Sequence, residues 1–296
     1  MHLEINSNAT PRWKSIDDLV ISCPDLPALP IGVTKVIQLT NSSDSTAQDI
    51  AMVISTDQSL TARILRLANS ALFGMPRKVT SIKEAVIILG HKNVRNLALV
   101  AGAMPWLTRA LPGYEMPQKA LMMHSFGVAT GAKMAAKLAK LPDAESAYIA
   151  GLLCDIGKFA LSNSLEGDIA AMITFGLEAG MSFDEIEVKV LGFSHAELSS
   201  RMAERWNLPE EIITAMRWHH EPSGAPEFEK LVACVHIGDF LTNTCGLGLG
   251  GDGLMYHFDK SAFQILGISA DDLDVIINEF IVAYELQEAI LLEIAA

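Results

Sequence analysis

Apolar residues recur at spacings of three and four along most of the chain, which is the pattern of helices that bury one face. The spacing is clearest over residues 60–72, 212–218 and 272–292. Sustained alternation of apolar and polar residues, which would indicate β-strands, is scarce. The pattern therefore predicts an all-α fold.

Local signals predict where several helices begin and end. A serine followed three residues later by an acidic residue favours a helix start, because the hydroxyl accepts a hydrogen bond from a first-turn N–H. Such pairs occur at Ser81–Glu84, Ser182–Glu185, Ser194–Glu197 and Ser269–Asp272. Pro209 is expected as the first residue of a helix, where its missing N–H costs little, and Gly90 as a helix end.

Turn-forming residues indicate how the chain is divided. Prolines gather between residues 105 and 117, and five of the eight residues 246–253 are glycine. Such stretches are typical of turns and flexible loops. We predict four segments, which are an N-terminal tail (1–19), a helical N-terminal lobe (20–112), a second helical lobe (113–245), and a Gly-rich loop with C-terminal helices (246–296).

Composition and charge narrow the choice of partners. Half of the residues are hydrophobic, which is ample for a core, and the formal net charge is −13. A surface this acidic repels phosphate backbones and anionic lipids, so neither nucleic acid nor a membrane is expected as a partner. The locally basic stretch 63–95 is interpreted as the solvated faces of ordinary helices.

The sequence carries no signal-peptide pattern and no apolar run long enough to span a bilayer. Its four cysteines form no CxxC pair. Reduced thiols and a cytoplasmic location are therefore expected.

Candidate chemistry gathers in the second half of the chain. Five of the eight histidines lie between residues 124 and 236, with Asp155 among them and Asp239 just after. Neutral imidazole and carboxylate suit zinc, iron and manganese. A single histidine is more often a hydrogen-bonded polar residue than a ligand, so these positions matter only if their sequence context is recognisable.

That context resembles the HD superfamily of metal-dependent phosphohydrolases. Residues 151–158, GLLCDIGK, are similar to the GLLHDIGK segment of that superfamily. The segments FSHAELSSRMAERWNLP (193–209) and VHIGDFL (235–241) follow in the expected order. Between them, IITAMRWHHEPSGAP (212–226) resembles the HHE-x-x-G-x-GYP element of the HD-GYP phosphodiesterases.

The first half of the chain makes the resemblance more specific. LPALPIGVTKVIQLT (26–40), STDQSLTARILRLANSALFG (55–74) and VTSIKEAVIILGHKNVRNLAL (79–99) closely resemble the N-terminal half of the HDOD domain. That domain is the HD-related output domain of bacterial signalling proteins. The resemblance covers roughly residues 20–245, and it implies a helical N-terminal lobe packed on an HD-type helical lobe.

The resemblance also implies a set of metal ligands for a divalent transition metal, which is iron, zinc or manganese. These ligands are His124, Asp155, His195, His219, His220 and Asp239. Asp155 would bridge two metals, and Lys158 would serve substrate phosphate or proton transfer. Asp155 and Lys158 are the catalytic candidates if the site is active, although a helix-face salt bridge between them is the alternative.

The sequence departs from the hydrolase pattern at two places. Cys154 stands where the HD pair has its histidine, and SGAP (223–226) lacks the tyrosine of GYP. A thiolate can bind zinc or iron, but a buried cysteine can also act as a small hydrophobic residue. We favour packing over ligation for Cys154.

Three functions remain open at this stage. The first is a regulatory module with a degenerate site, which binds signalling proteins or a small ligand without catalysis. The second is a residual phosphohydrolase acting on a nucleotide or cyclic dinucleotide. The third is a metal or redox sensor in which Cys154 lies beside bound iron. The HDOD resemblance favours the first, whereas the sequence leaves the ligand, the partner and the oligomeric state open.

Overall fold

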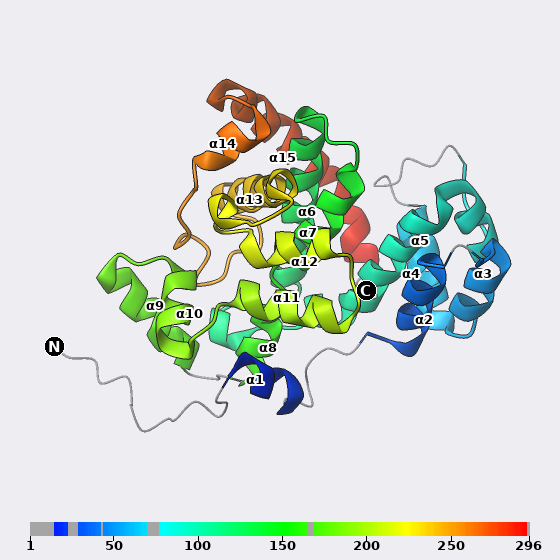
Figure 1. Ribbon diagram of the computed structural model, residues 1–296, viewed down its shortest axis with the longest axis horizontal. Helices are drawn as coiled ribbons and strands as arrows, with labels where there is room; N and C mark the ends of the chain where they lie inside the picture. Colours follow the sequence, from blue (N-terminus) through cyan, green and yellow to red (C-terminus); the bar gives the residue numbers. More distant parts are fainter. Residues whose placement is uncertain (1–14, 23–28, 43, 70–76, 165–167, 295–296) are drawn as a thin grey trace. The chain divides into compact units, whose positions relative to one another are not determined.

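The computed structural model describes residues 15–22, 29–42, 44–69, 77–164 and 168–294, and these residues are predominantly helical (Figure 1). Beyond the helices, they contain one isolated antiparallel bridge between Leu111 and Met116. The all-α prediction is confirmed. The elements are α1 (Ile16–Ser22), α2 (Ile31–Thr40), α3 (Ala47–Ser55), α4 (Gln58–Ala68), α5 (Ile82–Leu107), η2 (Pro112–Tyr114), α6 (Ala120–Leu138), α7 (Ala144–Leu153), α8 (Ile156–Ser164), α9 (Asp168–Ala179), α10 (Phe183–Leu191), α11 (His195–Arg205), α12 (Glu210–Trp218), η3 (Pro222–Gly224), α13 (Glu229–Thr244), α14 (Ser261–Leu266) and α15 (Ala270–Ile294).

The chain forms two compact units. One unit contains Met1–Pro27, Trp106–Arg205 and Pro209–Phe280, and the other contains Ala28–Pro105, Trp206–Leu208 and Ile281–Ala296. Among the described residues, no helix combines the length and the apolar character needed to cross a bilayer.

The unit that holds α2, α3, α4 and most of α5 is built from amphipathic helices. Val33 of α2, Ile50 of α3 and Leu60 of α4 are all fully buried. α2 packs on α3, and α3 packs on α4. α5 is interrupted at Gly90, whose φ of 81° and ψ of 167° are not helical. The predicted helix end is therefore found there, although a second helical segment follows directly.

The unit that holds the candidate ligands is centred on α6, α7 and α13, which pack closely (Figure 1). Small residues permit this approach. A methyl group on Gly238 of α13 would lie 2.3 Å from the carbonyl oxygen of Val128 on α6, so the two backbones nearly touch. This contact brings the polar residues of α6 and α13 to the same depth in the core.

The helix starts largely follow the predicted signals. Ser269 and Asp272 form a reciprocal pair at the start of α15, with Ser269 N 2.8 Å from Asp272 Oδ2 and Asp272 N 3.3 Å from Ser269 Oγ. Ser81 and Ser194 accept from the predicted N–H groups three residues later, at 3.2 Å each. Pro209 is the residue before α12 rather than its first helical residue, a shift of one position.

Candidate metal centre

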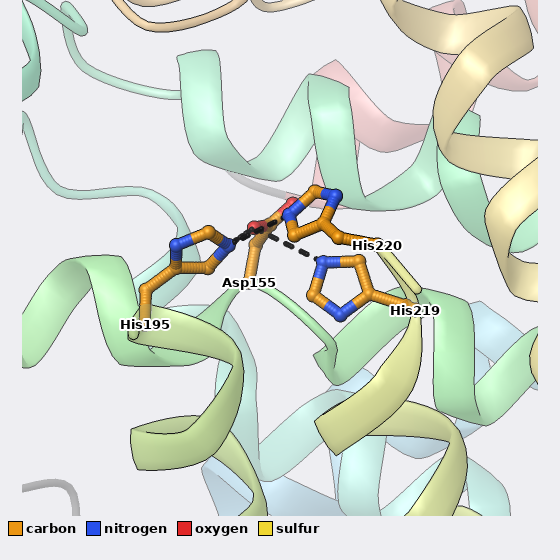
Figure 2. A group of neighbouring side chains, drawn as sticks. All are labelled: Asp155, His195, His219 and His220. Atoms are coloured by element: carbon orange, nitrogen blue, oxygen red, sulfur yellow. Dashed lines mark hydrogen bonds and ion pairs between the residues drawn. The ribbon is translucent and has the colours of Figure 1, made fainter. Parts of the chain in front are cut away.

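The six predicted ligands come together in one buried cluster, made of two groups that share Asp155. Figure 2 shows the four that form the larger group. Asp155 lies in the turn between α7 and α8, and His195 is the first residue of α11. His219 and His220 follow the last residue of α12. The other two ligands, His124 and Asp239, lie on α6 and α13. The side chain of each ligand is at most 8% exposed.

The ligand atoms form two groups that share Asp155. In the first group, the ligand atoms of Asp155, His195, His219 and His220 all lie within 4.8 Å of one another. Asp155 Oδ1 is 3.2 Å from His195 Nε2 and 3.9 Å from His219 Nε2. His195 Nε2 is 3.0 Å from His220 Nε2.

The second group consists of His124, Asp155 and Asp239. His124 Nε2 lies 3.0 Å from Asp155 Oδ2 and 3.2 Å from Asp239 Oδ1. Asp155 therefore presents one carboxylate oxygen to each group. This is the arrangement expected of a carboxylate that bridges two cation positions.

In three of the histidines, Nδ1 already has a hydrogen-bonding partner in the protein. This contact fixes the orientation of each ring. The Nδ1 atom of His195 lies 2.6 Å from Glu187 Oε2, and that of His219 lies 2.8 Å from the Met216 carbonyl oxygen. His124 Nδ1 lies 3.3 Å from the Leu247 carbonyl oxygen. An N–H at Nδ1 in each ring leaves Nε2 as the atom available to a metal.

Two buried nitrogens in the cluster lack a hydrogen-bond partner among the described residues. They are His219 Nε2, which is 3.9 Å from Asp155 Oδ1, and His220 Nδ1, which is 3.6 Å from Asp239 Oδ2. Buried polar atoms usually find partners, and leaving one without a partner costs about 1–3 kcal/mol. Two such imidazole nitrogens beside the carboxylates of Asp155 and Asp239, all of types that bind transition metals, fit a divalent cation.

The charges of the metal-free cluster follow from its geometry. Burial opposes a positive charge on His124, yet hydrogen bonding to Asp155 and Asp239 raises its pKa to about 9. Burial likewise opposes charge on His195, but Glu187 and Asp155 raise its pKa to about 10. Without a metal, protons on these two rings therefore compensate the carboxylates.

His219 and His220 behave in the opposite way. Burial lowers the pKa of both rings, and the neighbouring imidazoles of His219 and His195 lower that of His220 further. Both rings are therefore neutral at pH 7, which is the form that binds metal.

Cys154 lies beside this cluster but belongs to neither group. Its thiol donates to the carbonyl oxygen of Gly151 at 3.3 Å and lies 3.9 Å from Asp155 Oδ2. The side chain is fully buried, and burial raises its pKa well above the ordinary value. A protonated, inward-packed thiol supports the packing interpretation of this residue.

Lys158 is buried between two carboxylates. Its Nζ atom lies 3.2 Å from Asp155 Oδ1, as the helix-face alternative predicts, and 2.9 Å from Asp252 Oδ2. Burial disfavours the ammonium, but these carboxylates raise its pKa above the usual value, so it is charged. Asp252 lies in the Gly-rich loop that follows α13, and no sequence pattern connects it with Lys158.

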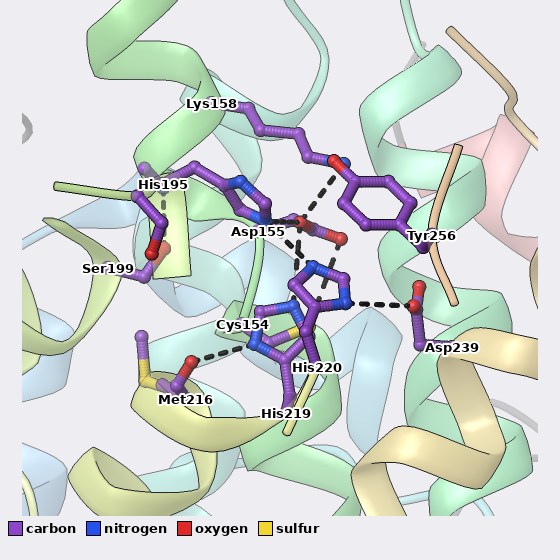
Figure 3. A network of polar contacts seen from close by, with 12 residues as sticks. Cys154, Asp155, Lys158, His195, Ser199, Met216, His219, His220, Asp239 and Tyr256 are labelled. Carbon is purple, nitrogen blue, oxygen red and sulfur yellow. Dashed lines mark hydrogen bonds and ion pairs between the residues drawn. The ribbon is translucent and has the colours of Figure 1, made fainter. Parts of the chain in front are cut away.

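Neither Glu187 nor Tyr256 was predicted from the sequence as a residue of the site. Conversely, His236 lies in the same helix as Asp239 but outside both ligand groups. Glu187 orients His195, and the Tyr256 ring stacks on His220 with centroids 4.2 Å apart (Figure 3). His236, which shares a helix face with Asp239, has both nitrogens occupied. Its Nδ1 lies 2.8 Å from the His219 carbonyl oxygen, and its Nε2 accepts from Asp259 N at 2.9 Å.

Solved structures share this fold. An HDOD domain protein of unknown function from Geobacter sulfurreducens superposes with a TM-score of 0.71 at 26% identity, covering 93% of this chain and 95% of that one. A phosphohydrolase candidate from Shewanella amazonensis SB2B gives a TM-score of 0.67 at 22% identity, over 94% of this chain and 98% of its own. At that identity the second likeness shows the fold alone.

Sequence comparison leads to the same class of protein. An uncharacterized protein of Treponema pallidum (strain Nichols) is 29% identical over 239 residues, which is 79% of this chain and 45% of the relative. This chain thus spans less than half the length of that curated relative. The HDOD domain model matches residues 26–222. The chain belongs to the HDOD domain family, a signalling-type family related to the HD phosphohydrolase fold.

Proposed function

We propose that this protein is a bacterial signal-transduction module that binds a small ligand or a partner protein and does not hydrolyse phosphodiesters. Its HD-type site holds one divalent transition metal ion, which is iron, zinc or manganese. The observation that carries the proposal is the position of Cys154. Its sulfur faces Gly151 instead of joining His124, Asp155 and Asp239.

The two groups of ligands are unequal for this reason. Asp155, His195, His219 and His220 supply four protein donors, whereas His124, Asp155 and Asp239 supply three. Cys154 is close to Asp155 Oδ2, the oxygen that faces the three-residue group. The missing histidine therefore weakens that group, and the four-residue group is the one expected to retain a metal.

A bound divalent ion would supply positive charge to a ligand and lower the pKa of a bound water. The chain's own residues supply the rest of the binding site. His195 and His219 orient their Nε2 atoms toward Asp155, and Lys158 offers a buried ammonium beside that carboxylate. A site with one ion and one ammonium can recognise an anionic group without a second ion to assist its cleavage.

A residual phosphohydrolase is the second candidate function, and one observation favours it. Asp155 still directs one oxygen to each group, which is what two bridged ions require. A redox sensor based on Cys154 has less support, because its thiol is buried and its pKa is raised.

The test is elemental analysis of untagged protein purified without chelator, combined with a phosphodiesterase assay. We expect about one metal ion per chain for the native protein and about two for Cys154→His, which restores a fourth donor to the three-residue group. Cys154→Ser serves as the control for a change at this position and should leave the content at about one. Two ions in the native protein, or phosphodiester turnover that is lost in Asp155→Ala, would overturn the proposal.

A further inference from the structure

The Gly-rich segment 246–259 lies over the ligand cluster and covers it. The Tyr256 ring is stacked on His220, with ring planes 4° apart, and the ammonium of Lys158 lies 5.0 Å from the centroid of the same ring (Figure 3). Leu247 is in contact with His124 through its carbonyl oxygen. The segment therefore closes over both groups of candidate ligands.

Asp252 is the fully buried acidic residue of this cover. Its Oδ2 atom lies 2.9 Å from Lys158 Nζ and accepts a hydrogen bond of 2.7 Å from the Tyr256 hydroxyl. Lys158 itself is only 2% exposed. The carboxylate thus occupies the position where the ammonium would meet an external anion.

The cover is held at a few points. Gly251 N donates to the Tyr114 carbonyl oxygen at 2.8 Å, and Asp259 N donates to His236 Nε2 at 2.9 Å. Between these anchors, Asp252 and Tyr256 contact the site. The Met255 carbonyl oxygen accepts from Phe183 N at 3.3 Å, and the Phe258 ring stacks on His236 with centroids 5.1 Å apart. A segment with five glycines in eight residues can adopt a second path with little steric hindrance.

The buried ammonium determines when this cover can move. Removing one partner of a buried ion pair is strongly unfavourable, because the remaining charge is left without compensation. Lys158 therefore keeps Asp252 in place as long as no other anion is present. An incoming anion that replaces the carboxylate keeps the ammonium paired, so the exchange avoids that cost.

We propose that Asp252 is an internal competitor for a phosphoryl anion, and that such a ligand binds beside Lys158 by displacing segment 246–259. The inference rests on the proposed function, since it assigns the ligand class and its control to the same site. A phosphoryl group suits the position because its several oxygens can contact Lys158 and an adjacent cation at once. Displacement also uncovers the His220 ring, so ligand binding changes the surface that a partner protein meets.

The experiment titrates inorganic phosphate into the full chain, as purified with its metal, by isothermal titration calorimetry. Asp252→Asn removes the competing charge, and we expect it to bind phosphate at least about tenfold more tightly than the native protein. Tyr256→Phe removes only the hydroxyl that holds Asp252, so it should shift affinity in the same direction by less. Asp274→Asn removes an equal charge from an exposed position of α15 and should change nothing.

Hydrogen–deuterium exchange provides the second measurement. In the native protein, saturating phosphate should speed exchange of the amides of Gly251 and Asp259, whose hydrogen bonds anchor the cover. Unchanged phosphate affinity in both Asp252→Asn and Tyr256→Phe would overturn the proposal. So would phosphate binding that leaves exchange over 246–259 unaltered, or acetate binding as tightly as phosphate.

The two proposals fail in distinguishable ways. If the metal content is about one per chain and the variants bind phosphate no better, the cover is structural and the proposed function stands. If the protein holds no metal but Asp252→Asn still binds phosphate more tightly, the metal part of the proposed function fails and the competition remains.

Discussion

At the scale of single residues, Glu187 holds the candidate ligand His195 in one orientation. This buried carboxylate accepts from the Tyr114 hydroxyl at 2.9 Å and from the backbone N–H of His195 at 2.8 Å. Its Oε2 atom also lies 2.6 Å from His195 Nδ1. A carboxylate behind a metal-binding histidine fixes the ring and increases its basicity.

We expect Glu187→Gln to weaken metal affinity by about 10–100-fold, the usual effect of losing such a carboxylate. The substitution keeps the shape of the side chain but removes the charge that stabilises the His195 N–H. Competition with a chromogenic chelator measures the affinity, and circular dichroism checks that the fold is retained. Asp184→Asn, on the same helix, is the matched control. Equal affinities in Glu187→Gln and the native protein would show that Glu187 serves only packing.

The grouping of the candidate ligands was predictable from the sequence, but the residues that support them were not. The six metal-ligand candidates were identified because an ordered set of motifs surrounds them, and the structure places all six in one cluster. Glu187 stands in an acidic stretch that looks solvated. Its spacing from Phe183 and Ile186, both buried, does place it on the apolar face of α10, and that signal could have revealed it.

At the scale of elements, the site depends on how closely α8 approaches α11. Gly157 N donates to Ser199 Oγ at 2.8 Å, and a methyl group at Gly157 would lie 2.2 Å from the His195 carbonyl oxygen. That carbonyl belongs to His195, one of the candidate ligands. The separation of these helices therefore sets the distance from Asp155 to His195.

We expect Gly157→Ala to lower the free energy of unfolding by about 1–3 kcal/mol, because backbone atoms cannot give way as a flexible side chain would. Metal affinity should fall as well, since α11 must move away from Asp155. Urea denaturation and elemental analysis measure the two effects. Gly180→Ala meets nothing within 4 Å and serves as the control, because it adds strain only through its φ of 63°. Native metal content in Gly157→Ala would contradict this account.

Element boundaries show where sequence patterns stop being informative. Amphipathic spacing predicted α4 and α15 well, because each must bury one apolar face. The segment after α13 was interpreted as a flexible loop because glycine is compatible with many conformations. Its structure instead depends on buried contacts of Asp252 and Tyr256 with residues far away in the sequence. Local composition does not contain that information.

At the scale of the whole molecule, the proposed metal would compete with protons for the same cluster. The raised pKa values of His124 and His195, about 9 and about 10, exceed the unfolded value of about 6.5. In the metal-free protein, the stabilisation from these protons is complete below pH 6.5 and is lost as the pH rises through 9 to 10. A bound metal would displace the same protons. The affinity for metal should therefore rise with pH, whereas the stability contributed by the protons falls.

We therefore expect zinc affinity to rise between pH 6.5 and pH 8.5, by roughly tenfold per pH unit for each proton displaced. The rise in melting temperature on adding zinc should be larger at pH 8.5 than at pH 6.5. Differential scanning calorimetry of chelator-treated and reloaded protein measures both. A zinc-induced shift that is independent of pH would mean that His124 and His195 are not ligands.

The contact between Lys158 and Asp252 also determines where this domain can be cut when it is truncated or fused to another protein. The family match ends at residue 222, whereas Asp239, Asp252 and Tyr256 all lie beyond it. A fragment cut at that point would retain the buried ammonium of Lys158 without one of its two counter-charges and the histidines without one carboxylate. The piece that can be transplanted as a working unit therefore extends past α13 and through the Gly-rich segment. Fusion junctions and truncations should be placed after residue 259.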